Sequence, residues 1–251
     1  MTRQACGRFT RRRFVLGGAT AGAGNVIGGS TFAGIEINGA GTVGTLIQGN
    51  AIGTDASGAS DFHNSYGVLV KNGASGNTVG GTAGGSGNVI AHNTLDGVAL
   101  LGSGTANAVE GNAIHANGGL AIDLGDDGVT LDDAGDGDIG PNDLQNFPVV
   151  TTARTTGVGQ FDVTGTLNAQ PSTTYRIEVF SSAAEDPTGY GEGSRYLGWM
   201  PAATDGAGNA SFSVTLPVSV PAGESVSATA TSPGGATSEM SRNRIATSLN
   251  S

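Results

Sequence analysis

The sequence repeats itself at a long interval, and this repeat constrains the fold more than any other feature. At a shift of 63 residues, GNVI at 24–27 falls on GNVI at 87–90. At a shift of 62 residues, GNAI at 49–52 falls on GNAI at 111–114. An internal period of this length predicts structural units that stack on one another.

Two shorter motifs recur within the repeat. One is Gly-aliphatic-x-aliphatic, as GIEI at 34–37, GVLV at 67–70 and GVAL at 97–100, with the variant AIDL at 121–124. Its period of two places both aliphatic side chains on one side of a very short strand. The other motif is Asn-x-aliphatic, and its asparagines are Asn25, Asn50, Asn77, Asn88, Asn93, Asn107 and Asn112.

Short strands that return every few tens of residues, with Gly and Asn at the corners, favour a parallel β-helix. Each strand would pair with its equivalent in the next coil, with aliphatic side chains inside and Asn side chains in hydrogen-bonded ladders. We expect five or six coils in residues 14–147. A β-propeller is the main competitor, but its blades need about 40 residues and longer strands.

The stretch TRRRFVLGGATAGAGNVI at 10–27 has two interpretations. Its arginines, followed by Phe14, Val15 and Leu16, are typical of a twin-arginine export signal. However, LGG at 16–18 falls on VGG at 79–81, and the run is too weakly apolar for a good signal. We therefore predict that 16–27 is part of a coil of the folded repeat, and that 1–13 is a basic segment outside the repeat or part of an export signal.

The pattern changes after Pro148 to longer alternating segments. Segments near 148–153, 160–167, 174–181, 196–203, 210–216, 225–232 and 238–245 are rich in β-formers. About seven strands in about 100 residues predict an Ig-like β-sandwich over 148–246, followed by a tail at 247–251. Its expected core residues are Phe161, Ile177, Val179, Phe180, Leu197, Phe212, Val214, Leu216 and Val226.

Composition excludes several classes of protein. Gly makes up 45 of the 251 residues without a Gly-X-Y period, which favours tightly turning β-structure over collagen. No apolar run is long enough to span a membrane. The formal net charge is −10, and Lys71 is the one basic residue between 14 and 153, so this surface would repel nucleic acid and anionic lipid. Cys6 is the single cysteine, so it cannot form an intrachain disulfide.

The motifs GNVI, GIEI, QGNAIGTD, GVLV, NTVGG and GNAIHANGGLAIDLG, followed by GPNDLQNFPVV, resemble the right-handed parallel β-helix repeat family of bacterial exported and surface proteins. The resemblance covers about 14–245 and implies a right-handed helix followed by an Ig-like domain. It also implies an extracellular or cell-surface location. Pectate lyases and some glycosidases share this helix, the pectin lyase-like fold, but a shared fold does not carry a shared function.

The stretch DLGDDGVTLDDAGDGDIGPND at 123–143 holds eight of the chain's 14 Asp residues. Carboxylates separated by glycines resemble calcium loops, because Ca²⁺ takes six to eight oxygen ligands and Gly lets backbone carbonyls join them. The spacing is not that of an EF-hand, and a solvated acidic loop is the alternative. The candidate ligands are Asp132, Asp133, Asp136, Asp138 and Asp143.

Catalysis on polysaccharides is the alternative to a non-catalytic role. A lyase needs a base, for which only Lys71 is available in the coils. A glycosidase needs two carboxylates, and Asp55 with Asp61, or Asp96 with Asp123, are the candidate pairs. The histidines His63, His92 and His115 lack metal-ligand spacing, although His92 and His115 are about one coil apart.

The stretch EDPTGYGEGSRYLGW at 185–199 combines aromatic and acidic residues in a Gly-rich loop. Aromatic faces beside acids can stack against sugars. We predict Tyr190, Glu192 and Arg195 as ligand-binding residues, and Trp199 as a core residue. The sequence as a whole predicts a non-catalytic structural or adhesive module that binds glycans and calcium, with self-association through an open helix end.

Overall fold

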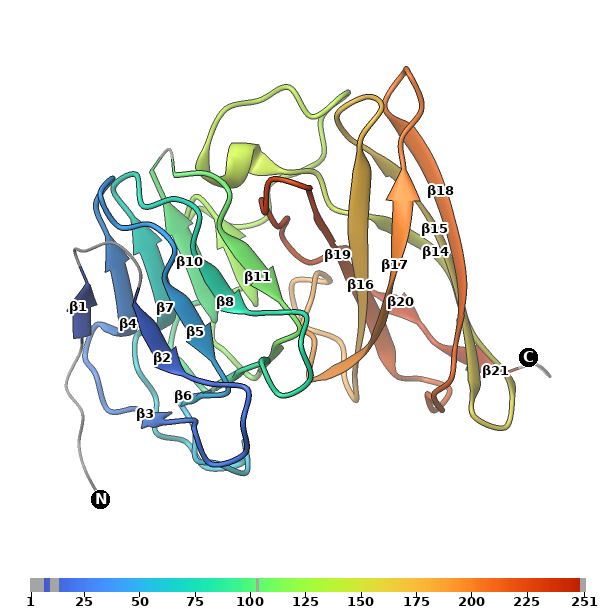
Figure 1. Ribbon diagram of the computed structural model, residues 1–251. Helices are drawn as coiled ribbons and strands as arrows, with labels where there is room; N and C mark the ends of the chain where they lie inside the picture. The colour runs from blue at the N-terminus through green and yellow to red at the C-terminus, as the bar shows by residue number, and fades with distance from the viewer. Residues whose placement is uncertain (1–6, 10–13, 103, 249–251) are drawn as a thin grey trace.

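The structure is a computed structural model that describes residues 7–9, 14–102 and 104–248. The arginines at 11–13, on which the export-signal interpretation depends, lie outside the described residues. The described chain is all-β apart from one 3-10 turn, η1 (Pro141–Leu144). Figure 1 shows two units side by side: a stack of short strands, and a second unit of longer strands.

The first unit consists of three parallel sheets, an arrangement consistent with a parallel β-helix. One sheet has the order β1 (Gly7–Phe9), β4 (Ala33–Asn38), β7 (Tyr66–Lys71), β10 (Val98–Leu101) and β13 (Ile122–Leu124). The second has the order β2 (Val15–Gly17), β5 (Leu46–Gln48), β8 (Thr78–Gly80) and β11 (Ala108–Glu110). The third has the order β3 (Val26–Ile27), β6 (Ala51–Ile52), β9 (Val89–Ala91) and β12 (Ala113–His115).

The strand register explains the sequence repeat. Leu16 pairs with Ile47, and Ile47 pairs with Val79, so the 63-residue shift spans two coils and not one. Residues 14–147 therefore hold four coils, and the expectation of five or six was wrong. Loops such as 53–65 make each coil longer than the short motifs suggest.

The prediction that 16–27 is part of a coil of the folded repeat is confirmed. β2 pairs with β5 and β3 pairs with β6 in the same parallel register as the later coils. Gly17 and its repeat partner Gly80 both have positive φ, and a Cβ on either would lie within about 2 Å of a carbonyl oxygen of the next coil. β1 adds one more strand beside β4, within the segment that the sequence placed outside the repeat.

The inside of the stack is filled by aliphatic side chains from all three sheets. Ile37, Ile47, Ile52 and Ile90 are fully buried, and they belong to one cluster that runs along the stack. The two aliphatic residues of GIEI and of GVLV also lie in this cluster, so they point inward as the alternation predicted.

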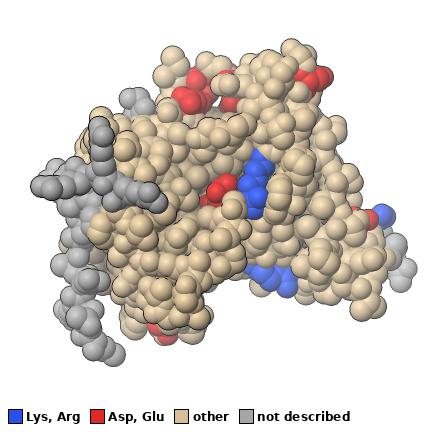
Figure 2. Space-filling model, viewed as in Figure 1, with Lys and Arg blue, Asp and Glu red and all other residues tan. Residues whose placement is uncertain are grey.

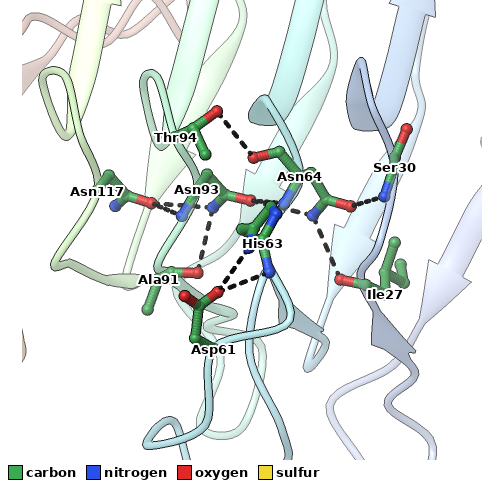
Figure 3. A network of polar contacts seen from close by, with 9 residues as sticks. All are labelled: Ile27, Ser30, Asp61, His63, Asn64, Ala91, Asn93, Thr94 and Asn117. Atoms are coloured by element: carbon green, nitrogen blue, oxygen red, sulfur yellow. Dashed lines mark hydrogen bonds and ion pairs between the residues drawn. The ribbon is translucent and has the colours of Figure 1, made fainter.

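Asparagine ladders line the corners of the stack, as the sequence predicted. In most steps, the Asn side-chain amide and backbone N–H donate to the Oδ1 of the Asn in the next coil; Asn64, Asn93 and Asn117 form one such ladder (Figure 3). The step from Asn107 to Asn142 differs: the Asn107 backbone N–H donates to the Asn142 Oδ1, and the Asn142 side-chain amide donates back to the Asn107 carbonyl. The other two ladders are Asn25–Asn50–Asn88–Asn112 and Asn77–Asn107–Asn142. Asn64, Asn117 and Asn142 were not among the asparagines singled out from the sequence.

The second unit has two four-stranded sheets that enclose one apolar core. The first has the order β18 (Asn209–Leu216), β15 (Gln160–Asn168), β14 (Val149–Gly157) and β21 (Thr247–Ser248). The second has the order β17 (Arg195–Ala203), β16 (Thr174–Ser182), β19 (Ser225–Thr231) and β20 (Arg244–Ile245). Six of the seven predicted strands are present, but the segment 238–245 forms only the short β20, and β21 lies in the predicted tail.

Two core predictions in this unit need correction. Phe180 is buried, but it belongs to the core of the first unit. Trp199 is 49% exposed, because a β-bulge leaves Leu197 as an extra residue between Tyr196 and Gly198 of β17. The bulge breaks the alternation of the strand, so Leu197 is buried while Trp199, two residues further on, faces outward. The other expected core residues pack in the second unit, with Val214 partly buried at its margin.

No helix among the described residues is long and apolar enough to cross a lipid bilayer.

Candidate functional site

The second unit caps the last coil of the first unit with three glutamates. Glu178 of β16 accepts a hydrogen bond from the Gly111 N–H at 2.8 Å. Glu192 accepts from the Asn117 N–H at 3.3 Å. Without such acceptors, the N–H groups of the last coil that face the second unit would form an unpaired sheet edge.

Glu239 makes the most complete of these contacts. Its two carboxylate oxygens accept from the backbone N–H groups of Leu124 and Thr130, at 2.9 and 3.0 Å. Thr237 completes the cap, because its hydroxyl oxygen accepts from the Val109 N–H at 3.0 Å. The last strand of each sheet thus donates to an acceptor of the second unit. Glu239 accepts from β13, Thr237 accepts from β11, and the Gly193 carbonyl accepts from β12.

Apolar packing continues across the same junction. Phe180 and Met240 of the second unit belong to the cluster that contains Ile114 and Ile122 of the last coil. Ile114 also exchanges two backbone hydrogen bonds with Gly193, each of 2.9 Å. Two side chains of the second unit therefore extend the core of the first unit, while the core between the two sheets of the second unit is a separate cluster.

Burial of the cap changes the ionisation of its acids. Burial raises the pKa of Glu239 to about 8, although the N–H groups of Leu124 and Thr130 oppose the shift. Burial also raises the pKa of Glu192 to about 7, and it raises the pKa of Glu178. In all three glutamates, removal from water disfavours the charged carboxylate relative to the neutral carboxylic acid.

Three of the five predicted metal ligands lie together in the acidic segment. Ligand oxygens of Asp133, Asp136 and Asp138 all lie within 4.8 Å of one another. Asp136 is 4% exposed, and the Oδ1 of Asp138 is buried without a hydrogen-bond partner among the described residues. Burial, and then the neighbouring acids, raise the pKa of Asp136 to about 6.

The other two predicted ligands are not in this group. Asp132 accepts a hydrogen bond from the Phe147 N–H at 2.9 Å. Asp143 lies in η1, one residue after Asn142, the last member of its Asn ladder. An all-oxygen group of three carboxylates with one unpartnered oxygen has the donor chemistry of a calcium site.

The four carboxylates proposed as glycosidase pairs are placed differently. Asp55 and Asp61 are each hydrogen-bonded within their own loop, to Ser57 and Ser60 and to His63. Asp96 and Asp123 are both buried and lie close enough to interact: burial, and then the charge of Asp123, raise the pKa of Asp96.

Aromatic and charged side chains surround the Asp96–Asp123 pair and continue along the outer face of the same sheet. The Tyr66 hydroxyl donates to Asp126 at 2.9 Å, and the Phe32 and Tyr66 rings meet edge to face at 6.1 Å between centroids. Lys71 lies 3.3 Å from Glu36 and over the Phe32 ring, so the candidate base is held in an ion pair.

The histidines form no metal site among the residues that the structure describes. The rings of His92 and His115 are neighbours one coil apart, 6.3 Å between centroids, as their spacing suggested. Burial, and then His92, lower the pKa of His115. His63 is exposed and hydrogen-bonded to Asp61.

The predicted ligand-binding residues are mostly engaged within the protein. Glu192 is part of the cap, and Arg195 is 3.7 Å from Glu224 and donates to the Ser219 carbonyl. Tyr190 meets Phe147 edge to face at 5.7 Å between centroids.

The exposed aromatic face lies elsewhere, on β16 and β17. The Arg176 guanidinium lies 4.2 Å from the centroid of Trp199 and donates to the Tyr196 hydroxyl. Arg176 also pairs with Glu178, and it reaches Glu110 across the junction at 3.8 Å. Figure 2 shows basic and acidic side chains next to each other between the two units. The bulge that exposes Trp199 could have been expected from Gly198, because a glycine inside a strand often marks a bulge.

Comparison of the chain with models of known protein families and with curated proteins gave no match.

Proposed function

We propose that this chain is a non-catalytic structural and adhesive module of an exported or cell-surface bacterial protein. In this proposal the first unit is a right-handed parallel β-helix and the second is an Ig-like domain, as the family resemblance implies. The observation that carries the proposal is the cap: the buried acids Glu178 and Glu239 are used to join the two units. Apolar packing across the junction and paired strand ends give a stiff body suited to holding a binding surface away from its attachment point.

Glycans are the ligands that we propose for this surface. Trp199 offers a half-exposed indole, and Tyr196 and Arg176 supply hydroxyl and guanidinium groups beside it. An aromatic face packs against the C–H face of a sugar ring, while the polar groups bind its hydroxyls. This surface takes the place of Glu192 and Arg195, whose side chains are occupied by contacts within the protein.

Glycan binding is tested on an array of neutral and acidic polysaccharides, with the whole chain and its Trp199→Ala variant. Because Trp199 lies outside the core, the variant should keep its melting temperature and lose binding. A matched control is Val158→Ala, which changes a fully exposed apolar side chain in a turn of the same unit. If neither the whole chain nor the control binds any glycan, the adhesive part of the proposal is wrong.

We also propose that Asp133, Asp136 and Asp138 bind calcium and stiffen the segment between the two units. The segment is already tied to both units: Asn142 exchanges hydrogen bonds with Asn107 of the first unit, and Asn146 donates to the Asn168 carbonyl of the second. Within the segment, Asp136 accepts from the Asn146 N–H. A cation would offset the repulsion between the three carboxylates. Self-association through the first coil is a further part of the proposal, since Val15 and Val26 are about half exposed there.

A polysaccharide-cleaving enzyme is the second candidate, and one observation favours it. Asp96 is a buried acid with a raised pKa beside Asp123, which is the environment of a general acid in a glycosidase. Incubation with a panel of polysaccharides and mass analysis of soluble products tests it. Products that disappear in the Asp96→Asn variant would establish catalysis, and no products from any substrate would exclude it for that panel.

A further inference from the structure

A surface hollow lies at the start of the second unit and belongs to none of the sites above. Its volume is about 610 Å³, and it is lined by 147–150, Glu185, Gly189 and 242–244. Three chain segments far apart in sequence thus form its walls. The Tyr190–Arg242 bridge and the contact between Tyr190 and Phe147 hold these segments together.

The hollow has two cations without acidic partners. Arg242 and Arg244 are exposed, and neither guanidinium makes an ion pair with any described residue. By contrast, Lys71, Arg176 and Arg195 are each paired with a glutamate. In a chain of net charge −10, two unpaired arginines at one hollow form a local positive site for an anion.

Asn243, between these arginines, has an unsatisfied amide. Both its Nδ2 and its Oδ1 are buried, and neither has a hydrogen-bond partner among the described residues. Its backbone is fixed, because its N–H donates to the Gly189 carbonyl at 2.9 Å. Buried polar groups are nearly always paired, so this amide lacks a partner that a group bound in the hollow would supply.

The remaining walls define the shape and the charge of the ligand. Pro148 and Val149 give an apolar side, and Val149 is 49% exposed. Glu185 gives one carboxylate, which accepts hydrogen bonds and disfavours more than one negative charge on the ligand. A sugar ring fits these requirements: its C–H face packs on the apolar side, its hydroxyls pair with an amide that both donates and accepts, and one carboxylate pairs with arginine.

We propose that this hollow binds one uronic-acid residue of an acidic polysaccharide, with Arg242 and Arg244 on the carboxylate and Asn243 on a hydroxyl. The proposal rests on the glycan binding proposed above, and it adds a substrate class and a second contact point to it. Guanidinium groups bind planar carboxylates through two parallel hydrogen bonds, which neutral sugars cannot form.

The test is calorimetric titration of the whole chain with an oligogalacturonide and with a neutral oligosaccharide of the same length. The double variant Arg242→Gln/Arg244→Gln should bind the oligogalacturonide at least about tenfold more weakly, since it loses charge-assisted hydrogen bonds. The control Arg154→Gln removes an arginine of β14 outside the hollow and should bind as the unchanged chain does. Asn243→Leu should also weaken binding, and melting temperatures of all variants verify folding.

The outcomes separate this inference from the proposed function. If Trp199→Ala abolishes oligogalacturonide binding and the double arginine variant does not change it, the hollow is not the site and the glycan proposal stands. Equal binding of the acidic and the neutral oligosaccharide would overturn the role of the carboxylate. If no glycan binds the unchanged chain, both proposals are wrong.

Discussion

We expect the buried cap to make the stability of this protein depend on pH in an unusual direction. Most acids in proteins have lowered pKa values and lose stabilising contacts as pH falls. Glu239 is 2% exposed, and burial raises its pKa from 4.5 to about 8. A group whose pKa is raised on folding contributes stability that is complete below its unfolded pKa and is lost as pH rises through its folded pKa. Stability should therefore increase on acidification from pH 8 to about pH 5.

The size of this effect follows from the pKa difference. Each pKa unit corresponds to about 1.4 kcal/mol, so Glu239 alone would change the free energy of unfolding by up to about 3 kcal/mol between pH 7 and pH 5. Glu192, with its pKa raised to about 7 by burial, adds to the change in the same direction.

Urea unfolding followed by circular dichroism at pH 5, 6, 7 and 8, with a calcium chelator present, measures this dependence. Glu239→Gln removes the titrating group and keeps one acceptor, so its stability should vary less with pH than that of the unchanged chain. Glu185→Gln, at an exposed acid, should leave the dependence intact. An unchanged pH dependence in Glu239→Gln would refute the assignment of the effect to the cap.

Four further tests concern the core at the junction, an asparagine ladder, the acidic group and Trp199. Met240→Ala should lower the free energy of unfolding by about 2–5 kcal/mol, because it opens a cavity where the second unit extends the core of the first, and urea titration measures it. Asn88→Ala removes a buried ladder member and leaves the Asn50 N–H unpaired, so it should cost at least about 1–3 kcal/mol by the same titration. Millimolar calcium should raise the melting temperature, and Asp136→Asn should remove this rise; no rise in the unchanged chain would exclude the metal proposal. Trp199→Ala should change the melting temperature little, and a large loss would show that the indole supports the fold.

The coil architecture could be predicted because its determinants are local and repeated. Gly17 and Gly80, or Asn25 and Asn88, occupy equivalent corners, and each corner needs a specific residue type. The number of coils was harder to predict. The best match of the sequence to itself, at a shift of 63 residues, aligns each coil with the second coil after it, so one sequence repeat contains two coils. Asn142 could have been found, since Asn142-x-Leu144 fits the motif that identified the other ladder members.

The cap could not be predicted, because nothing local distinguishes its acids. Glu178 lies on an alternating strand and Glu192 in a loop, where acids are ordinarily solvated. Only the docking of the second unit on the last coil brings them to unpaired N–H groups. The exposure of Trp199 also depends on pairing between strands: a bulge in β17, where it pairs with β16, turns the indole outward, and a regular alternation along the sequence does not predict this.

Hydrogen exchange of the whole chain, read by mass spectrometry, tests the capped stack most directly. The account predicts that the amides of Gly111, Asn117 and Leu124 are protected as strongly as those of the buried strand β7, since all belong to one cooperative body. Exchange of these three amides as fast as that of the exposed loop 82–85 would contradict it, because the last coil would then be open to water.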